Sequence, residues 1–306
     1  GAAAAAAWVP PQLTVVEWLR QHGQPSSLCE WLWYPLAYAS LNQDPAVAAA
    51  QPYVRVVAEL FGSTPGASSI GLPSVPLDEL YAEPAARYIE AHGGSVRRKV
   101  GARVDLAPAR GHHRVSVGEQ VLSASAVISA VPWYAIARLW TGPIPARLAA
   151  IVDSATRLES APIVTVYLWF DRPIMSERQI GLVGTAFHWV FRKDVDTRRL
   201  FLVTLVASGA EGLLRQSNEE LAALAERDLR ACLRGAAGAS CLRSLVVREA
   251  RATFSLAPDA PERPPAATPV PGFFLAGDWT ATGLPGTIES GVMSGHLAAD
   301  AAMIVL

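Results

Sequence analysis

Residues 272–291 read GFFLAGDWTATGLPGTIESG, and this stretch indicates the fold. The apolar run from Phe273 to Ala276 predicts a buried strand that ends at a glycine and an aspartate. A turn rich in glycine and proline follows, and Thr287 after it is a good N-cap for a final helix. The stretch therefore predicts a strand, a turn and a helix that pack closely together.

The start of this final helix predicts a site for an electron-rich ligand. The first N–H groups of a helix have no partner within it, and the helix dipole adds positive charge there. A reduced flavin carries negative charge near N1 and the C2 carbonyl, which suits such a position. The carboxylate at the strand end is placed to accept hydrogen bonds from a polyol such as ribityl; a tight turn without a ligand is the alternative. The expected cofactor contacts here are Gly277, Asp278, Gly286, Thr287, Ile288 and Glu289.

Composition limits the class of protein. The 306 residues are 51% hydrophobic and 17% charged, so the chain can bury a large core in one or two domains. The net charge of -1 gives no field that would attract nucleic acid, which we exclude as a partner.

The cysteines show no metal-ligand spacing, and no metal is expected. No segment is long and apolar enough to span a bilayer, so we expect a cytoplasmic protein and leave contact with the inner membrane surface open.

The rest of the chain alternates between helical and β patterns. Residues 13–61 and 77–92 are predicted to be helical, and the loop 62–76 separates them. The continuous apolar run 126–131, ended by Pro132, predicts a strand buried on both faces. A three-strand meander is predicted at 96–106, 114–117 and 120–122, with His112 and His113 in a solvated turn. Further strands are predicted at 163–170, 184–191, 200–208 and 245–253. A helix is predicted at 218–233, and it begins with a capping box from Ser217 to Glu220.

The stretch from Gly277 to Gly295 resembles the C-terminal FAD signature of amine oxidases, phytoene desaturases and related flavoproteins. This resemblance implies FAD as the cofactor. Val100, after Gly94-Ser95-Val96, looks like the family's adenine-contacting position. Residues 128–132 look like the family strand that ends in a proline near FAD, here Pro132. A simple β meander would explain each of these two weaker matches as well.

The fold class implied is α/β with mixed α+β character. We expect a Rossmann-like FAD/NAD(P)-binding domain of the amine oxidase type, interrupted by a substrate domain of mixed sheet and helices. The order of the predicted elements assigns residues 77–132 and 266–306 to the FAD-binding domain. Residues 8–76 and 133–265 are assigned to the substrate-binding domain.

Two further regions narrow the resemblance to the hydroxysqualene dehydroxylase family. Residues 31–42 resemble that family's aromatic-Pro-Leu and Leu-Asn region, and residues 168–173 and 181–191 resemble its central strands. The resemblance implies a long apolar isoprenoid substrate, with hydroxysqualene reduced to squalene in bacterial hopanoid biosynthesis. The expected substrate-pocket residues are Trp33, Asn42 and His188, whereas no residue is assigned as the catalytic acid.

One departure from this family concerns the cofactor. The family begins with a Gly-x-Gly-x-x-Gly turn for the diphosphate, and this turn has no counterpart before residue 13. We therefore expect an N-terminally truncated relative that lacks the first βαβ unit, binds FAD poorly or not at all, and purifies without yellow colour. The alternatives are a carotenoid- or phytoene-type desaturase, an amine oxidase-like flavoenzyme and, in another class, a catalytically silent lipid-binding fragment.

Overall fold

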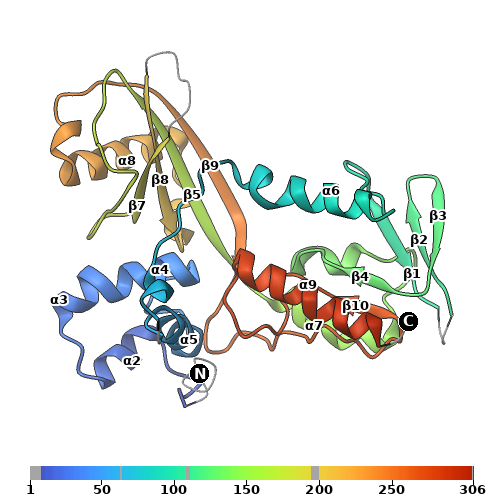
Figure 1. Ribbon diagram of the computed structural model, residues 1–306. Helices are drawn as coiled ribbons and strands as arrows, with labels where there is room; N and C mark the ends of the chain where they lie inside the picture. Colours follow the sequence, from blue (N-terminus) through green and yellow to red (C-terminus); the bar gives the residue numbers. More distant parts are fainter. Residues whose placement is uncertain (1–7, 63, 108–110, 194–199, 305) are drawn as a thin grey trace.

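A computed structural model of the chain describes residues 8–62, 64–107, 111–193, 200–304 and 306 (Figure 1). A sheet with one covering helix lies at the upper left of the view, above a block of short helices. A third part, on the right, holds short strands and the C-terminal helix, and two long strands of the sheet run down toward it. The mixture of helices and sheets agrees with the predicted α+β character.

The helical block is divided into short helices, whereas the sequence predicted one helical region. Thr14 and Glu17 cap the first helix reciprocally, and Gly23, in the left-handed backbone region, follows its end. Asn42, also left-handed, ends a later helix. The elements are α2 (Val15–Gln21), α3 (Ser26–Leu28), the π-helical η1 (Cys29–Trp33), α4 (Tyr34–Leu41), α5 (Ala50–Leu60) and the 3-10 turn η2 (Pro65–Ser68).

The large sheet is antiparallel throughout and has the order β6-β7-β8-β5-β9. One face packs against α8, where alternate residues such as Val164 and Leu205 meet Leu221 and Leu229. The predicted capping box of α8 is confirmed, because the Ser217 hydroxyl accepts from the Glu220 N–H. The elements are β5 (Ser160–Phe170), β6 (Gln179–Gly181), β7 (Trp189–Lys193), β8 (Phe201–Ser208), β9 (Cys241–Phe254), α8 (Asn218–Cys232), and the short turns η6 (Glu211–Leu213) and η7 (Arg234–Ala236).

A small parallel pair of strands carries the C-terminal motif. β10 (Phe273–Leu275) pairs with β4 (Val127–Ser129), and α9 (Ile288–Met303) contacts both strands. β10 is fully buried, as predicted. The prediction that β4 is buried on both faces is wrong: Ile128 is 44% exposed, because β10 is the only strand paired with β4 in the described part of the chain.

The predicted meander is present, with a shorter first strand, β1 (Ala102–Asp105), and slightly longer second and third strands, β2 (His113–Val117) and β3 (Gln120–Ala124). The prediction of a solvated His113 is wrong. Its side chain is fully buried, where Nδ1 accepts from the Ala107 N–H and Nε2 lies 3.1 Å from the Pro271 carbonyl. The remaining elements are η3 (Asp78–Ala82), α6 (Glu83–Ala91), η4 (Trp133–Arg138), η5 (Ala146–Leu148) and α7 (Ala149–Arg157).

The largest buried cluster joins parts of the chain that the sequence assigned to different domains. Leu19 and Tyr53 of the helical block share it with Trp133, Phe273 and Trp279. The division into two domains therefore stays a prediction. Among the described residues, no helix combines the length and apolar character needed to cross a bilayer.

Candidate cofactor turn and substrate cavity

The turn that joins β10 to α9, the cofactor turn, is held in place at its first residue. The Gly277 N–H donates to the Ser294 hydroxyl at 2.7 Å, which joins the strand end to α9. Gly277 has a φ of 122°, a backbone conformation that side-chain-bearing residues rarely adopt. The fully buried Trp279 indole donates to the Val131 carbonyl at 2.9 Å. The end of β10, the end of β4 and the middle of α9 are therefore held together.

The start of α9 has the geometry that the sequence predicted. The Thr287 hydroxyl accepts from the Ser290 N–H at 3.1 Å, which confirms Thr287 as the N-cap. The Ser290 hydroxyl contacts the Thr282 hydroxyl at 2.6 Å and donates to the Asp278 carbonyl at 3.0 Å. In the part of the chain that the structure describes, the N–H groups of Ile288 and Glu289 have no protein acceptor. These two donors remain available to a ligand.

Asp278 and Gly286 face each other at this turn. Burial raises the pKa of the Asp278 carboxyl, and the charge of nearby Arg263 opposes this shift only weakly. A Cβ on Gly286 would lie 3.1 Å from Thr253 and 3.3 Å from Asp278 Oδ2, so a side chain there would press on both residues. A desolvated carboxylate beside free N–H groups fits a polyol and an electron-rich ring, and the residues present therefore fit a flavin.

The two weaker cofactor predictions lie in different places. Pro132 is the N-cap of η4, directly after Val131, whose carbonyl accepts from Trp279. Val100 lies before β1 and next to Gly118 of the β2–β3 turn, and it is 42% exposed. The structure thus brings Pro132 next to the turn, whereas contact of Val100 with a cofactor stays a prediction.

An apolar cavity of about 560 Å³ lies between α4 and the sheet face that α8 does not cover. Its size is typical of small-molecule sites. The indole N–H of Trp189 is buried and has no acceptor among the described residues, so the wall holds one unused hydrogen-bond donor. The lining residues are Trp31, Leu32, Pro35, Leu36, Ala39, Ile70, Ile163, Gln179, Trp189, Phe191, Val206 and Ser208.

His188 lines a neighbouring cavity of about 280 Å³, and Pro35 borders both cavities. The imidazole stacks on Tyr38 with ring centroids 3.9 Å apart. Its Nδ1 accepts from the Ser208 N–H at 3.2 Å, which places the ring proton on Nε2. Burial lowers the pKa of His188 to about 4, and the charge of Asp44 counteracts this only in part. The imidazole is therefore neutral at pH 7.

Trp33 and Asn42 are not among the residues that line these cavities. The Trp33 indole donates to Gln24 Oε1 at 2.8 Å and packs against the main core. Asn42 is buried and uses both of its amide atoms in hydrogen bonds. Sequence reasoning missed Trp31 and Leu32, although the spacing 31, 32, 35, 36 and 39 is the stripe expected for one helix face. Substrate contact by Trp33 and Asn42 stays a prediction.

Comparison with known proteins supports the predicted family and its flavin cofactor. The family described as flavin containing amine oxidoreductase matches residues 48–303. A hydroxysqualene dehydroxylase of Sinorhizobium fredii is 32% identical over 88% of this chain and 61% of its own length. A 15-cis-phytoene desaturase of Narcissus pseudonarcissus is 24% identical over 94% of this chain and 53% of its own length. The chain thus spans about half to three fifths of these relatives.

A solved structure agrees with the predicted fold. Cyclohexylamine oxidase from Brevibacterium oxydans superimposes with a TM-score of 0.65 over 99% of this chain and 72% of that chain, at 14% identity. At this level of identity the likeness shows the fold alone. Together with the family match, it confirms the predicted mixed α/β fold of the amine oxidase type.

Proposed function

Because the chain belongs to the family of flavin-containing amine oxidoreductases, we propose that the protein is an FAD-dependent oxidoreductase that acts on a long isoprenoid. The substrate we propose is hydroxysqualene, and the product is squalene. The apolar cavity between α4 and the sheet is the observation that carries this proposal. The similarity to hydroxysqualene dehydroxylases supports it.

The cavity walls suit an apolar chain with one polar group. Aliphatic and aromatic side chains dominate them, and Trp189 adds a donor with no protein acceptor in the described part of the chain. Removal of an allylic hydroxyl develops positive charge on carbon, which water would capture. The apolar lining of the cavity, which includes Trp189, would limit the access of water, and aromatic faces stabilise nearby cations.

The cofactor turn would hold the group that supplies the reducing equivalents of the reaction. When bound, reduced FAD supplies the hydride that replaces the hydroxyl group of the substrate, which leaves as water after taking up a proton. Asp278 would hold the ribityl hydroxyls of the cofactor, and the free N–H groups of Ile288 and Glu289 would stabilise the negative charge of its reduced ring. No residue is assigned here as the proton donor.

A phytoene-type desaturase is the second candidate, because relatives of that name cover 94% of this chain. Product analysis separates the two. We expect the flavin-loaded protein to convert hydroxysqualene to squalene under reducing conditions and to leave phytoene unchanged. Desaturated phytoene would favour the second candidate. Turnover of neither isoprenoid, with oxidation of a primary amine instead, would reject both.

A cavity-filling variant tests where the substrate lies. Ala39 lines the cavity and is exposed at its edge, so Ala39→Trp adds bulk there without disturbing the core. We expect kcat/KM for hydroxysqualene to fall by at least about tenfold, with flavin content unchanged. Leu242→Trp, at an exposed position on β9, is the matched control. Equal activity of both variants would place the substrate elsewhere.

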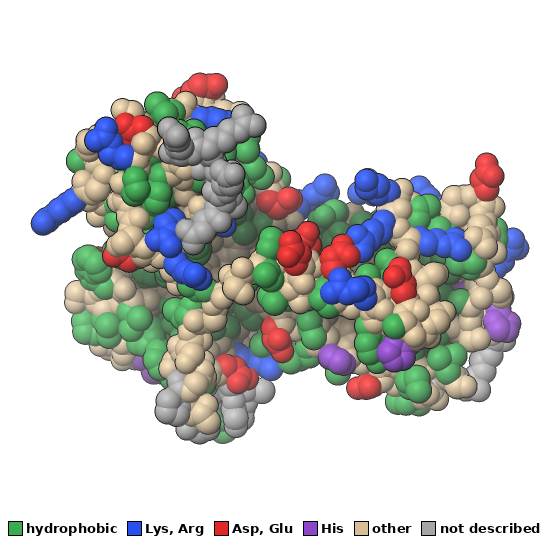
Figure 2. Space-filling model, turned by 45° about the horizontal axis from the view of Figure 1, so that its top comes forward, with side chains coloured by type: hydrophobic (Ala, Val, Ile, Leu, Met, Phe, Trp, Pro, Cys, Tyr) green, Lys and Arg blue, Asp and Glu red, His purple; other side chains and the backbone are tan. Residues whose placement is uncertain are grey.

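We also propose that the protein contacts the membrane surface at the mouth of this cavity. Trp31 and Ile70 line the cavity and are 70% and 74% exposed. Figure 2 shows hydrophobic side chains gathered over the helical block at the left, whereas charged side chains of both signs cover the right part. Exposed aromatic and aliphatic side chains of this kind favour the headgroup boundary. Sedimentation with phospholipid vesicles, compared with Trp31→Ser, tests this contact.

A further inference from the structure

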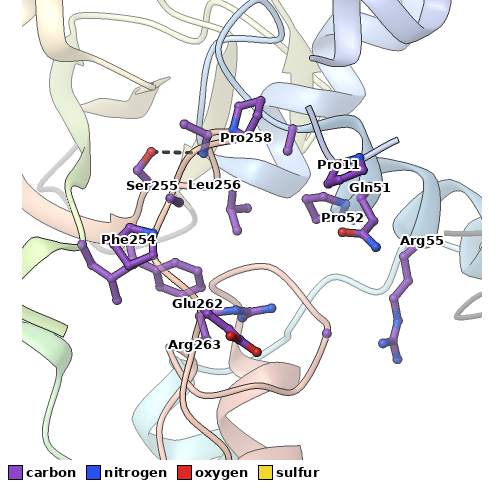
Figure 3. A pocket seen from close by; sticks show the side chains of 16 residues that line it. Pro11, Gln51, Pro52, Arg55, Phe254, Ser255, Leu256, Pro258, Glu262 and Arg263 are labelled. Atoms are coloured by element: carbon purple, nitrogen blue, oxygen red, sulfur yellow. Dashed lines mark hydrogen bonds between the residues drawn. The ribbon is translucent and has the colours of Figure 1, made fainter. Parts of the chain in front are cut away.

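A third cavity lies beside the cofactor turn and contains two arginines. It has a volume of about 350 Å³ and lies between α5, the segment 254–263 and Gly283 (Figure 3). In Figure 3, Arg55 extends from α5 on one side of the turn, and Arg263 lies on the other side. The predicted site residues do not include either arginine.

Arg55 brings hydrogen-bond donors that the protein does not use. Its Nη1 donates to the Thr282 carbonyl at 3.4 Å, a long contact. Its Nε is buried and has no acceptor in the described part of the chain. A buried N–H of a charged group without an acceptor is costly, so a site of this kind is stabilised when a ligand provides one.

Arg263 is held by the same turn from the other side. Its Nη1 donates to the Leu284 carbonyl at 2.8 Å and lies 3.4 Å from the Asp278 carbonyl. The guanidinium lies over the Phe254 ring, 5.1 Å from its centroid. Burial lowers the pKa of Arg263; the charge of Asp278 counteracts this shift, and the charge of Arg55 adds to it to a smaller extent. Arg263, like Arg55, therefore contacts a backbone carbonyl of the turn and lines the same cavity.

Two carboxylates near these arginines, those of Glu262 and Asp278, are not bonded to them. Glu262 also lines the cavity but is exposed, and Asp278 attracts Arg263. Within the described ranges, neither carboxylate forms an ion pair with either arginine. The cavity thus presents two guanidinium groups, and each still has unused donors.

We propose that Arg55 and Arg263 form a binding site for a phosphate-type oxyanion beside the cofactor turn. A guanidinium presents its donors in a planar fork that matches phosphate oxygens, and an anion in the cavity that both arginines line would supply the acceptor that Arg55 Nε lacks. Gly283 permits this arrangement, because a side chain there would overlap Arg55 Nη1. The oxyanion belongs either to the diphosphate of bound FAD or to a separate phosphate-bearing molecule. The site does not depend on which substrate is reduced.

Calorimetric titration of the purified chain with inorganic diphosphate tests the site without any assay of turnover. We expect binding by the parent chain and an affinity lower by about ten- to a hundredfold in Arg55→Gln and in Arg263→Gln. Arg55→Lys, which keeps the charge but loses the fork, should fall between parent and Arg55→Gln. Arg234→Gln, at an exposed position, should bind like the parent. Circular dichroism and melting temperature show whether each variant is folded.

Competition identifies the source of the oxyanion. If FAD and ADP displace diphosphate, the site serves the cofactor; if diphosphate still binds in the presence of saturating FAD, a separate phosphate-bearing molecule uses it. Absence of diphosphate binding by the parent chain overturns the proposal. So does equal binding by the parent and both glutamine variants, because the arginines would then only hold the turn through its carbonyl groups.

Discussion

Asn42 and Thr253 join the end of α4 to the end of β9, with Asn42 Nδ2 3.0 Å from the Thr253 hydroxyl. The side chain of Thr253 also lies against Gly286, where an added Cβ would be 3.1 Å away. One residue of the sheet therefore contacts both the helix that lines the apolar cavity and the cofactor turn. This contact fixes the position of the cavity relative to the turn.

Asn42→Ala should lower the free energy of unfolding by at least about 2 kcal/mol, because it leaves the Ala161 carbonyl and the Gly209 N–H unpaired in a buried place. Urea unfolding measures this loss. Asn42→Gly loses the same bonds but tolerates the left-handed backbone, where φ is 52°. If Asn42→Gly is as stable as the parent, backbone strain and not hydrogen bonding explains the effect of alanine.

Asp278→Asn should stabilise the cofactor-free chain at pH 7 and weaken FAD binding. Burial raises the pKa of Asp278 above its unfolded value, so the stability that protonation contributes is present at low pH and is lost as pH rises through the folded-state pKa. The amide of the Asp278→Asn variant does not titrate, so the variant does not lose this stability at pH 7. It also lacks the charged acceptor of the carboxylate, so its FAD affinity should fall by about tenfold or more. Urea unfolding at pH 5 and 7 and FAD titration measure both effects.

The exposed Asp300 on α9 provides the control for this experiment. Asp300→Asn makes the same change of charge without burial and should alter neither quantity. An unchanged FAD dissociation constant in Asp278→Asn would end the cofactor assignment for this residue.

His188 should make the protein less stable as pH falls from 6.5 toward 4. Burial lowers the pKa of His188 from 6.5 to about 4, so in this window the unfolded chain binds a proton that the folded chain does not. His188→Phe keeps a ring against Tyr38 and removes the titration, so its stability should change less between pH 7 and pH 5. Equal pH dependence in parent and variant would contradict the assignment; His296→Gln, at an exposed position, is the control.

Gly283→Ala should destabilise the fold by about 1–2 kcal/mol, because Gly283 has a φ of 74° and a methyl group would meet Arg55. Thermal unfolding measures the change. Gly212→Ala is the matched control, since Gly212 has open space around its Cβ position and is not among the glycines with positive φ. A melting temperature equal in both variants would show that the turn adjusts freely.

Sequence alone predicted the elements whose signals are local. The N-caps Thr287 and Ser217 bond to groups three residues away, so the residue types report on the structure directly. The strand predicted at 163–170 is confirmed as part of β5, whose side chains alternate between more and less buried positions because they point to opposite faces of the sheet. The single helical region predicted before residue 62 was too coarse, because left-handed residues such as Asn42 divide it.

The identity of the cofactor turn also came from the sequence, since its glycines, aspartate and N-cap are contiguous in residues 277–287. Tertiary structure alone decided what surrounds this turn. Arg55 reaches the Thr282 carbonyl across 227 positions of the chain, and Asn42 reaches Thr253 across 211. His113 became buried through its contact with the Pro271 carbonyl, 158 positions away. No local pattern encodes such pairs, because they form only when strands and helices from distant segments pack around one core.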